Sequence, residues 1–221
     1  MRVPSSVEEA VRLQDELAPS VVRSARPGFA PRTAAGLDVA YATDSPLVAA
    51  AVVTVSVATG EVLESATALG TAEFPYVPGL FAFRELPTLL LALARLTVTP
   101  DVLLADGHGL AHPRRFGLAC HLGVETGLPA IGVAKTPLGR YADPAGARGA
   151  RTPLLDGDEV VGAALRTQPG VKPVFVSIGH LVDLDTACAQ VLALAPRYRL
   201  PETTRRADHL SRRTLHTRTD R

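Results

Sequence analysis

Three strand-like runs follow one another early in the chain, and they constrain the fold more than any other feature. Residues 34–42, 46–57 and 61–70 are dominated by small and β-branched side chains, and the turn sequence ATGE joins the last two. Neighbouring runs with such a short turn between them are typical of an antiparallel meander. We therefore expect the sheet of this protein to begin with antiparallel strands.

Helical and strand-like segments alternate after the meander. Apolar residues at helical spacing predict helices at 80–96, 114–127 and 183–195. Short apolar runs predict strands at 101–106, 129–135 and 173–179, and an Asp-Gly turn predicts a hairpin at 152–165. This order favours an α/β fold whose mixed sheet, an antiparallel meander followed by parallel strands after helical crossovers, is flanked by helices.

Length and composition fit one domain over residues 1–221. The chain is 47% hydrophobic and 20% charged, which excludes a disordered protein. Its net charge is +1, but residues 201–221 contain six Arg and only three acids. We therefore expect a flexible basic tail at 211–221. Cys120 and Cys188 lie far apart without the spacing of zinc ligands, so they are predicted to be inert core residues. A monomer is expected.

The N-terminal segment predicts a helix and no targeting signal. Ser5 or Ser6 is followed three residues later by Glu8 or Glu9, a capping box that opens an amphipathic helix to about Leu17. The same acids interrupt the apolar stretch that a signal peptide needs. No apolar run approaches the ~20 residues that span a bilayer. We expect a cytoplasmic protein that does not cross a membrane.

Three acids stand where packing alone does not explain them. Asp38 lies inside the first strand, Glu85 on the helix after the meander, and Asp106 at the end of the next strand. A buried carboxylate without a partner costs several kcal/mol, so something must compensate its charge. If the first and fourth strands are neighbours, Asp38 and Asp106 converge, and a divalent cation is the simplest compensation. Alternatively, Asp106 only caps the turn at Gly107.

This arrangement of strand Asp, helix Glu and strand Asp resembles the ribonuclease H-like nucleases, which use metal ions on such carboxylates to cut phosphodiesters. Longer motifs resemble the endonuclease V family, deoxyinosine-directed repair nucleases, over residues 34–210: PYVPGLFAFRELP at 75–87, DGHGLAHPRRFGLACHLG at 106–123, PAIGVAK at 129–135 and KPVFVSIGHLVDLDTA at 172–187. Ala40, Leu181 and the single Lys of VAKTPL depart from the family pattern, and none of them is a carboxylate.

The resemblance implies a metal site. Asp38 and Asp106 would be the metal-binding pair and Glu85 the third catalytic carboxylate. The expected ion is Mg²⁺, for which Mn²⁺ would substitute, because a bound cation activates water and stabilises charge on the phosphate. Whether one or two ions act stays open. Asp208 would complete the site, although a tail acid among arginines could also be a salt-bridged helix residue.

The resemblance also implies residues that recognise the substrate. In the loop stiffened by Pro75 and Pro78, Tyr76 would act as a wedge that fills the gap left by a base removed from the stack. Gly79 would let the backbone approach that base. An ordinary core position is the alternative for Tyr76, and a turn with positive φ is the alternative for the glycine.

Further candidates flank the predicted metal site. Gly107 and Gly132 would also let the backbone read the flipped base, with a turn position as the alternative. His112 would bind the scissile phosphate or shuttle a proton, unless it is merely solvent-exposed. Lys135 would contact phosphate as a point charge. The only other lysine, Lys172, is interpreted as a strand-edge charge.

By the resemblance, the chain is a deoxyribonuclease V that nicks DNA containing deoxyinosine, with inosine in RNA as a further candidate substrate. The cut would fall at the second phosphodiester on the 3′ side of the lesion and leave 3′-hydroxyl and 5′-phosphate ends. Two alternatives stay open: another ribonuclease H-like nuclease such as a structure-specific resolvase, and a non-catalytic inosine-binding module. The intact set of carboxylates argues against the second.

Overall fold

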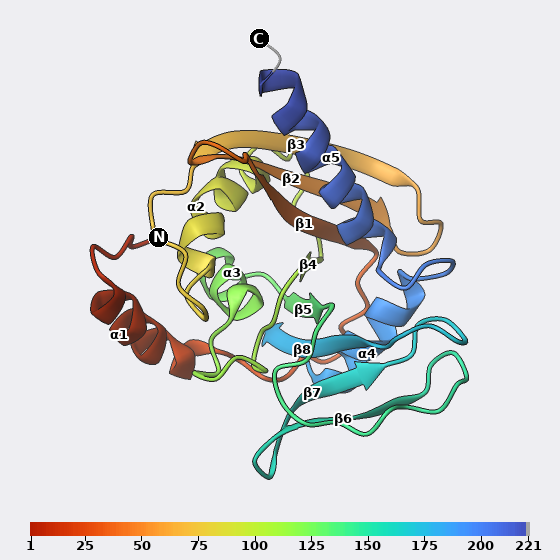
Figure 1. The fold of residues 1–221 in the computed structure, drawn as a ribbon. Helices are drawn as coiled ribbons and strands as arrows, with labels where there is room; N and C mark the ends of the chain where they lie inside the picture. Colours follow the sequence, from red (N-terminus) through yellow and green to blue (C-terminus); the bar gives the residue numbers. More distant parts are fainter. Residues whose placement is uncertain (220–221) are drawn as a thin grey trace.

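An eight-stranded sheet organises the chain, with the strand order β3-β2-β1-β4-β5-β8-β7-β6 (Figure 1). The structure is a computed structural model and describes residues 1–219. Its strands are β1 (Thr33–Tyr41), β2 (Leu47–Ser56), β3 (Val62–Thr71), β4 (Val102–Ala105), β5 (Ala130–Ala134), β6 (Arg151–Asp156), β7 (Glu159–Leu165) and β8 (Val174–His180). Its helices are α1 (Val7–Leu17), α2 (Ala82–Leu93), α3 (Leu118–Thr126), α4 (Leu184–Ala193) and α5 (Glu202–Thr219), with a 3-10 turn, η1 (Ala18–Ser20).

The strand pairings confirm the predicted meander and show that the first and fourth strands are neighbours, the condition under which Asp38 and Asp106 were expected to converge. β1 pairs antiparallel with β2, and β2 with β3, while β1 pairs in parallel with β4 and β4 with β5. The predicted strand at 173–179 is present as β8, and it runs antiparallel to β5. Between β5 and β8 the chain makes the β6–β7 hairpin without a crossover helix, so successive strands reverse direction.

Helices cover both faces of the sheet, as the apolar pattern predicts. α2 and α3 pack on one face through side chains such as Leu86, Leu89 and Leu122. α4 and the start of α5 pack on the other face through side chains such as Val191 and Ala207. Figure 1 shows these pairs of helices on opposite sides of the strands. In this three-layer arrangement a helix from each face approaches the carboxyl end of β4.

The C-terminal segment is a helix packed on the sheet, so the prediction of a flexible tail is wrong for residues 211–219. Ala207, Ser211 and Leu215 recur every four residues and are all buried. This spacing places them on one face of α5, where Leu215 packs beside Ala40 of β1. Burial of that face holds the helix on the sheet despite its arginines. Residues 220 and 221 lie outside the described part of the chain.

The N-terminal helix has the predicted capping box. Ser6 Oγ accepts a hydrogen bond from the Glu9 N–H at 3.1 Å, and Glu9 Oε2 accepts one from the Ser5 N–H at 2.7 Å. α1 then buries Leu13 against a cluster that includes Phe83. None of the helices in the described residues is long and apolar enough to cross a bilayer.

The two cysteines agree with their predicted role. Both Cys120 and Cys188 are buried and unpaired, and burial raises the pKa of each thiol. They therefore belong to the core.

Gly36 of β1 tests how tightly α5 sits on the sheet. A Cβ added there would lie 2.2 Å from the carbonyl carbon of Thr203, which is backbone and cannot move aside cheaply. We expect Gly36→Ala to lower the free energy of unfolding by about 3 kcal/mol or more through overpacking. Urea denaturation measures it, with Gly146→Ala as the control because nothing lies within 4 Å of a Cβ there. Equal stability of the two variants would contradict this packing.

Candidate active site

Carboxylates from three elements meet at the carboxyl end of the β1–β4 pair. Asp38 points to the face that α5 covers, and the Ser211 hydroxyl donates a 2.8 Å hydrogen bond to its Oδ2. Asp106 follows directly after β4. Glu85 belongs to the first turn of α2, on the other face of the sheet. The three acids that the sequence singles out are therefore brought to one place.

Burial and repulsion by neighbouring carboxylates disfavour the ionised forms of Asp38 and Glu85. Burial is the main reason why the pKa of Asp38 rises to about 6, and the nearby Asp106 and Asp208 charges add to the rise. Burial likewise raises the pKa of Glu85 to about 8, with further contributions from Asp38 and Asp106. A cation bound among these desolvated carboxylates would reduce their mutual repulsion.

Lys135 supplies one positive charge at this place. It follows β5 directly, and its ammonium forms a salt bridge with the Asp106 carboxylate. Partial burial opposes the charged form, but the contacts with Asp106 raise the pKa of Lys135 above its usual value. The Lys135 ammonium is therefore a cation in direct contact with Asp106.

The donor set fits a hard divalent cation, although the side chains are not closed around one. Within residues 1–219, no three His, Cys, Asp or Glu side chains are grouped closely enough to hold a metal ion. The groups present are carboxylates, which Mg²⁺ and Mn²⁺ prefer. The Asp106 charge raises the pKa of Asp38, and the charges of Asp38 and Asp106 raise the pKa of Glu85, so a cation among them would relieve this repulsion. Direct ligation by Asp106 Oδ2 requires Lys135 to release that oxygen.

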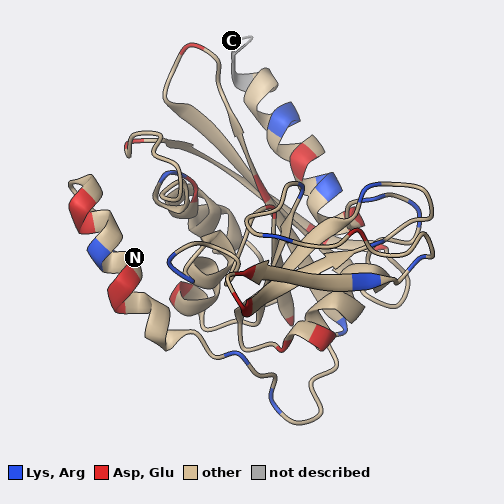
Figure 2. Ribbon diagram, turned by 60° about the horizontal axis from the view of Figure 1, so that its bottom comes forward, with Lys and Arg blue, Asp and Glu red and all other residues tan. Residues whose placement is uncertain are grey.

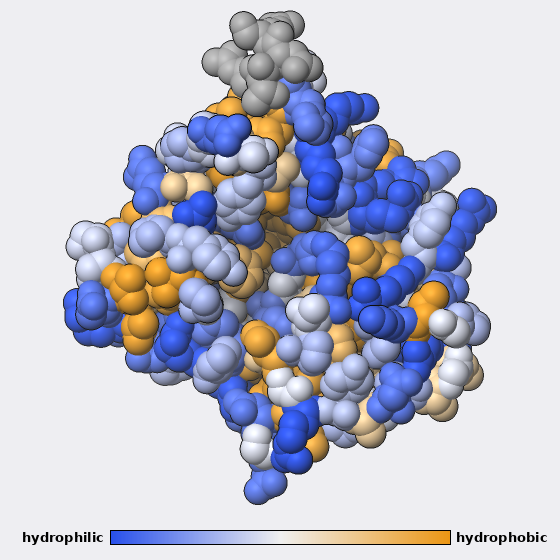
Figure 3. All heavy atoms as spheres, viewed as in Figure 1, coloured by the Kyte–Doolittle hydropathy of each residue, from blue (hydrophilic) through white to orange (hydrophobic). Residues whose placement is uncertain are grey.

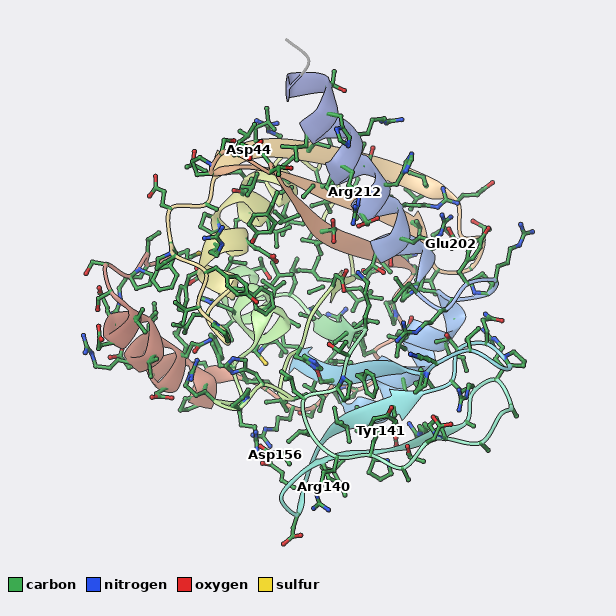
Figure 4. All side chains as sticks on the ribbon, viewed as in Figure 1. Asp44, Arg140, Tyr141, Asp156, Glu202 and Arg212 are labelled. Atoms are coloured by element: carbon green, nitrogen blue, oxygen red, sulfur yellow. The ribbon has the colours of Figure 1, made fainter. Side chains whose placement is uncertain are left out.

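Asp208 shows both features that its sequence position allows. Its Oδ1 accepts a 2.9 Å hydrogen bond from the Arg212 guanidinium one turn later on α5, which confirms the salt-bridged helix residue. Its charge also raises the pKa of Asp38, so the two carboxylates lie within electrostatic reach. Its role as a metal ligand stays a prediction. Figure 4 shows Arg212 on α5, with Asp44 of the β1–β2 turn nearby.

Two further side chains, which were not expected from the sequence, hydrogen-bond to the carboxylates of Glu85 and Asp38. The Tyr41 hydroxyl donates a 3.0 Å hydrogen bond to Glu85 Oε1, and the Arg84 guanidinium lies over the Tyr41 ring at 5.2 Å from its centroid. Ser211 holds Asp38, as described above. A signal existed for Ser211, because it lies three residues after Asp208 and so shares its helix face.

The loop between β3 and α2 carries Tyr76 outward. Its side chain is 75% exposed, which excludes the core position considered as an alternative. Phe74 is buried beneath the loop, while Pro75 and Pro78 are exposed on either side of the tyrosine. Gly79 has φ +80°, a conformation that glycine adopts without strain. An exposed aromatic ring on a stiff loop is available to a ligand.

Three donors converge on the carbonyl oxygen of Gly79 and fix this loop. They are Gln14 Nε2 at 3.1 Å, His112 Nε2 at 2.8 Å and an Arg114 guanidinium nitrogen at 3.2 Å. Gln14 is completely buried on α1, and its Oε1 accepts a 2.6 Å hydrogen bond from Arg114 Nε. The N-terminal helix thus positions the loop, a role that its sequence did not reveal.

His112 is part of this network and is only 2% exposed, so the solvent-exposed alternative is wrong. Its Nδ1 accepts from the Arg114 backbone N–H at 3.2 Å while its Nε2 donates to Gly79. Burial lowers the pKa of His112 to about 4, which leaves the ring neutral at pH 7. In this arrangement both ring nitrogens bind the protein. Its predicted contact with phosphate remains untested.

Gly107 and Gly132 lie where backbones approach closely. A Cβ on Gly132 would lie 2.6 Å from the Gly109 nitrogen and 2.7 Å from the Gly107 carbonyl oxygen. A Cβ on Gly107 would lie 3.2 Å from the Phe81 ring. Gly132 is therefore required for this close backbone approach, whereas a Cβ on Gly107 would only need a small shift of the Phe81 ring. Their contact with a base stays a prediction.

The surface around the acids is hollowed. In Figure 3, a depression lies near the centre of the face shown, below α5 and between its polar side chains and those of the loops beneath. Figure 1, in the same view, has the carboxyl end of β4 in this region. The acids are thus placed where an extended ligand has access.

Comparison with known proteins decides the family. The sequence profile of the family described as endonuclease V matches residues 15–209. The endonuclease V of Streptomyces avermitilis is 58% identical over 215 residues, which are 96% of this chain and 93% of that protein. The chain belongs to the endonuclease V family. Its mixed sheet flanked by helices is the ribonuclease H-like fold that the sequence predicts.

Solved structures of endonuclease V share the whole architecture. The crystal structure of the Streptomyces avermitilis endonuclease V has a TM-score of 0.94 and 56% identity, covering 98% of this chain and 96% of that one. A Ciona intestinalis endonuclease V, crystallised with a 24mer DNA containing an inosine followed by a ribo-adenosine, has a TM-score of 0.84 and 27% identity. That match covers 96% of this chain and 98% of the other.

The repulsion among the acids predicts that a neutral substitution stabilises the fold. We expect Asp38→Asn to raise the free energy of unfolding in EDTA at neutral pH by about 1–3 kcal/mol, since the amide keeps an acceptor for Ser211 and removes a desolvated charge. Chemical denaturation measures the change. Asp44→Asn, at an exposed acid of the β1–β2 turn, is the matched control. A destabilised Asp38→Asn variant would show that the ionised carboxylate is structural instead.

Proposed function

We propose that this endonuclease V acts on deoxyinosine in DNA and depends on a divalent metal ion, Mg²⁺ or Mn²⁺. The observation that carries the proposal is the convergence of Asp38, Glu85 and Asp106 beside a rigid loop with an exposed tyrosine. Support also comes from the Ciona relative, which was crystallised on inosine-containing DNA. A binding module that only recognised inosine would have no use for three partly buried acids.

The acids and Lys135 would carry the chemistry. Asp38 and Asp106 would hold the metal, with Glu85 and Asp208 completing its surroundings. A bound divalent cation supplies an activated water and neutralises charge on the phosphate. Lys135, released from Asp106, would then be free to contact the phosphate as a point charge.

The loop at Tyr76 would recognise the lesion. A base that leaves the stack exposes a gap, and an aromatic ring inserted there offsets part of the cost of unstacking. Pro75 and Pro78 restrict the loop, and the three hydrogen bonds to Gly79 hold its end, so little entropy is lost when Tyr76 inserts. The backbone around Gly107 and Gly132 would read the edge of the flipped hypoxanthine.

The expected product follows from the family. The strand would be cut at the second phosphodiester on the 3′ side of the lesion, leaving 3′-hydroxyl and 5′-phosphate ends. Inosine in RNA would be a further substrate, because the proposed contacts involve the base and the phosphate rather than the sugar. We place this activity in DNA repair in the cytoplasm.

Cleavage of matched oligonucleotides tests the proposal. With Mg²⁺, the wild-type protein should nick a duplex with one deoxyinosine at the second phosphodiester, and leave the same duplex with deoxyadenosine intact. Asp106→Asn should slow single-turnover nicking by at least about 100-fold, because it removes a charged ligand next to the reacting phosphate. Asp44→Asn should nick normally.

Two outcomes would contradict the proposal. Full activity in EDTA would exclude the metal-dependent mechanism. Cleavage that ignores the inosine but follows junctions or flaps would favour a structure-specific nuclease. Product sizes read against a ladder locate the cut, and circular dichroism shows whether each variant is folded.

A further inference from the structure

A second cleft shares Lys135 with the site described above, while its other residues have no role there. Its volume is about 470 Å³. It is formed by the loop after β5, the β7–β8 connection and the segment between α4 and α5. Its polar lining includes Lys135, Tyr141, Arg166, Lys172 and Arg199. Figure 4 shows Tyr141 below the centre of the view, on the opposite side from Asp44 and Arg212.

A buried arginine, Arg166, and a partly buried one, Arg199, form the walls of this cleft. Arg199 donates to the carbonyl oxygens of Lys135, Lys172 and Pro173 at 2.7, 3.0 and 2.8 Å. Arg166, only 7% exposed, donates to the Pro144 carbonyl at 2.6 Å and pairs with Asp143 at 2.8 Å. These contacts tie three separate loops together, so the cleft is formed before any ligand arrives.

The lining is strongly cationic. It contains four basic side chains and one acid, Asp143, which Arg166 already engages. The carbonyl partners of Arg199 carry no net charge, so its positive charge is not neutralised. The Lys172 side chain is exposed and forms no salt bridge with any residue of the described chain. Figure 2 shows Lys and Arg on several loops at the right of the molecule. A polyanion fits such a surface.

Tyr141 adds an aromatic surface to this charge. Its ring packs edge-on against Phe175 of β8, with centroids 4.9 Å apart, and 38% of the residue is exposed. Phe175 thereby holds the Tyr141 ring in place from one side. Exposed aromatic rings in basic grooves stack the bases of single-stranded nucleic acids without sequence preference.

The position of the cleft beside the acids indicates which part of a bound strand would enter it. Lys135 belongs both to the cleft and to the carboxylate site, through Asp106. The Tyr76 loop precedes α2, whereas the cleft is formed by the loops around β7 and β8, and Figure 1 shows these elements on opposite sides of β4 and β5. A strand with its lesion at Tyr76 and its cut at Asp106 would therefore continue into the cleft.

We propose that this cleft binds the nucleic-acid strand 3′ of the cut, with Lys172 on a phosphate and Tyr141 stacked on a base. The inference rests on the proposed function, because the lesion fixes the register of the strand. Its consequence is that affinity depends on the length of the 3′ flank.

Binding of end-labelled single strands in EDTA tests this. Each strand carries one deoxyinosine and has a 3′ flank that either extends well beyond the cut or stops next to it. The wild-type protein should bind the long flank more tightly. Lys172→Ala should lose most of this difference and reduce the slope of log K against log salt by about 0.7, the value for one phosphate contact on a single strand. Arg32→Ala is the charge-matched control. Arg32 precedes β1 and so lies at the amino end of that strand, away from the cleft.

Substitution of Tyr141 provides an independent test of the same proposal. Tyr141→Ala should weaken binding of the long flank by about tenfold, whereas Tyr141→Phe, which keeps the ring, should bind like the wild type. Neither variant should change affinity for the short flank. Equal losses on long and short flanks, or an unchanged salt slope in Lys172→Ala, would overturn the proposal. Failure of the proposed function looks different, because the wild type would then neither prefer inosine nor nick it.

Discussion

The parallel pairing of β1 with β4 is the constraint on which the site depends. The register sets Leu37 opposite Ala105. The next residues, Asp38 and Asp106, therefore lie side by side at the carboxyl end of the paired segment. One step of slippage would turn Asp38 to the opposite face of the sheet. The remaining parts of the site are arranged around this end: α2 brings Glu85, β5 brings Lys135, and α5 brings Asp208 and Ser211.

The chain keeps these acids together at an electrostatic cost. Burial and mutual repulsion raise the pKa values of Asp38 and Glu85 to about 6 and about 8. Lys135, Ser211 and Tyr41 offset part of the cost through direct contacts. Core packing on both faces of the sheet must supply the rest, and the close contact of Gly36 with Thr203 shows how firmly α5 is seated. Such an environment is typical of functional sites, where ionisable groups are kept partly buried although this lowers the folding stability.

Much of this arrangement could be predicted from the sequence, and the exceptions have physical reasons. The meander and the three acids followed from local patterns, because side-chain periodicity and buried charge are local signals. The pairing of β1 with β4 joins distant segments and could only be assumed. The direction of β8 could not be predicted, because apolar runs carry no information on strand direction. The tail was mispredicted because its arginines obscured the four-residue spacing of Ala207, Ser211 and Leu215. The convergence of Gln14 and His112 on Gly79 joins distant segments, so no local pattern reveals it.

The central claim is that the acids at the edge of the β1–β4 pair form a divalent metal site. The most direct measurement is an anomalous difference map from crystals grown with Mn²⁺, collected at the manganese absorption edge. The account predicts a peak between Asp38 and Asp106, with Lys135 moved away from Asp106, and loss of that peak in Asp38→Asn crystals. A well-ordered site without manganese density there, or manganese bound elsewhere with Lys135 still paired to Asp106, would contradict it.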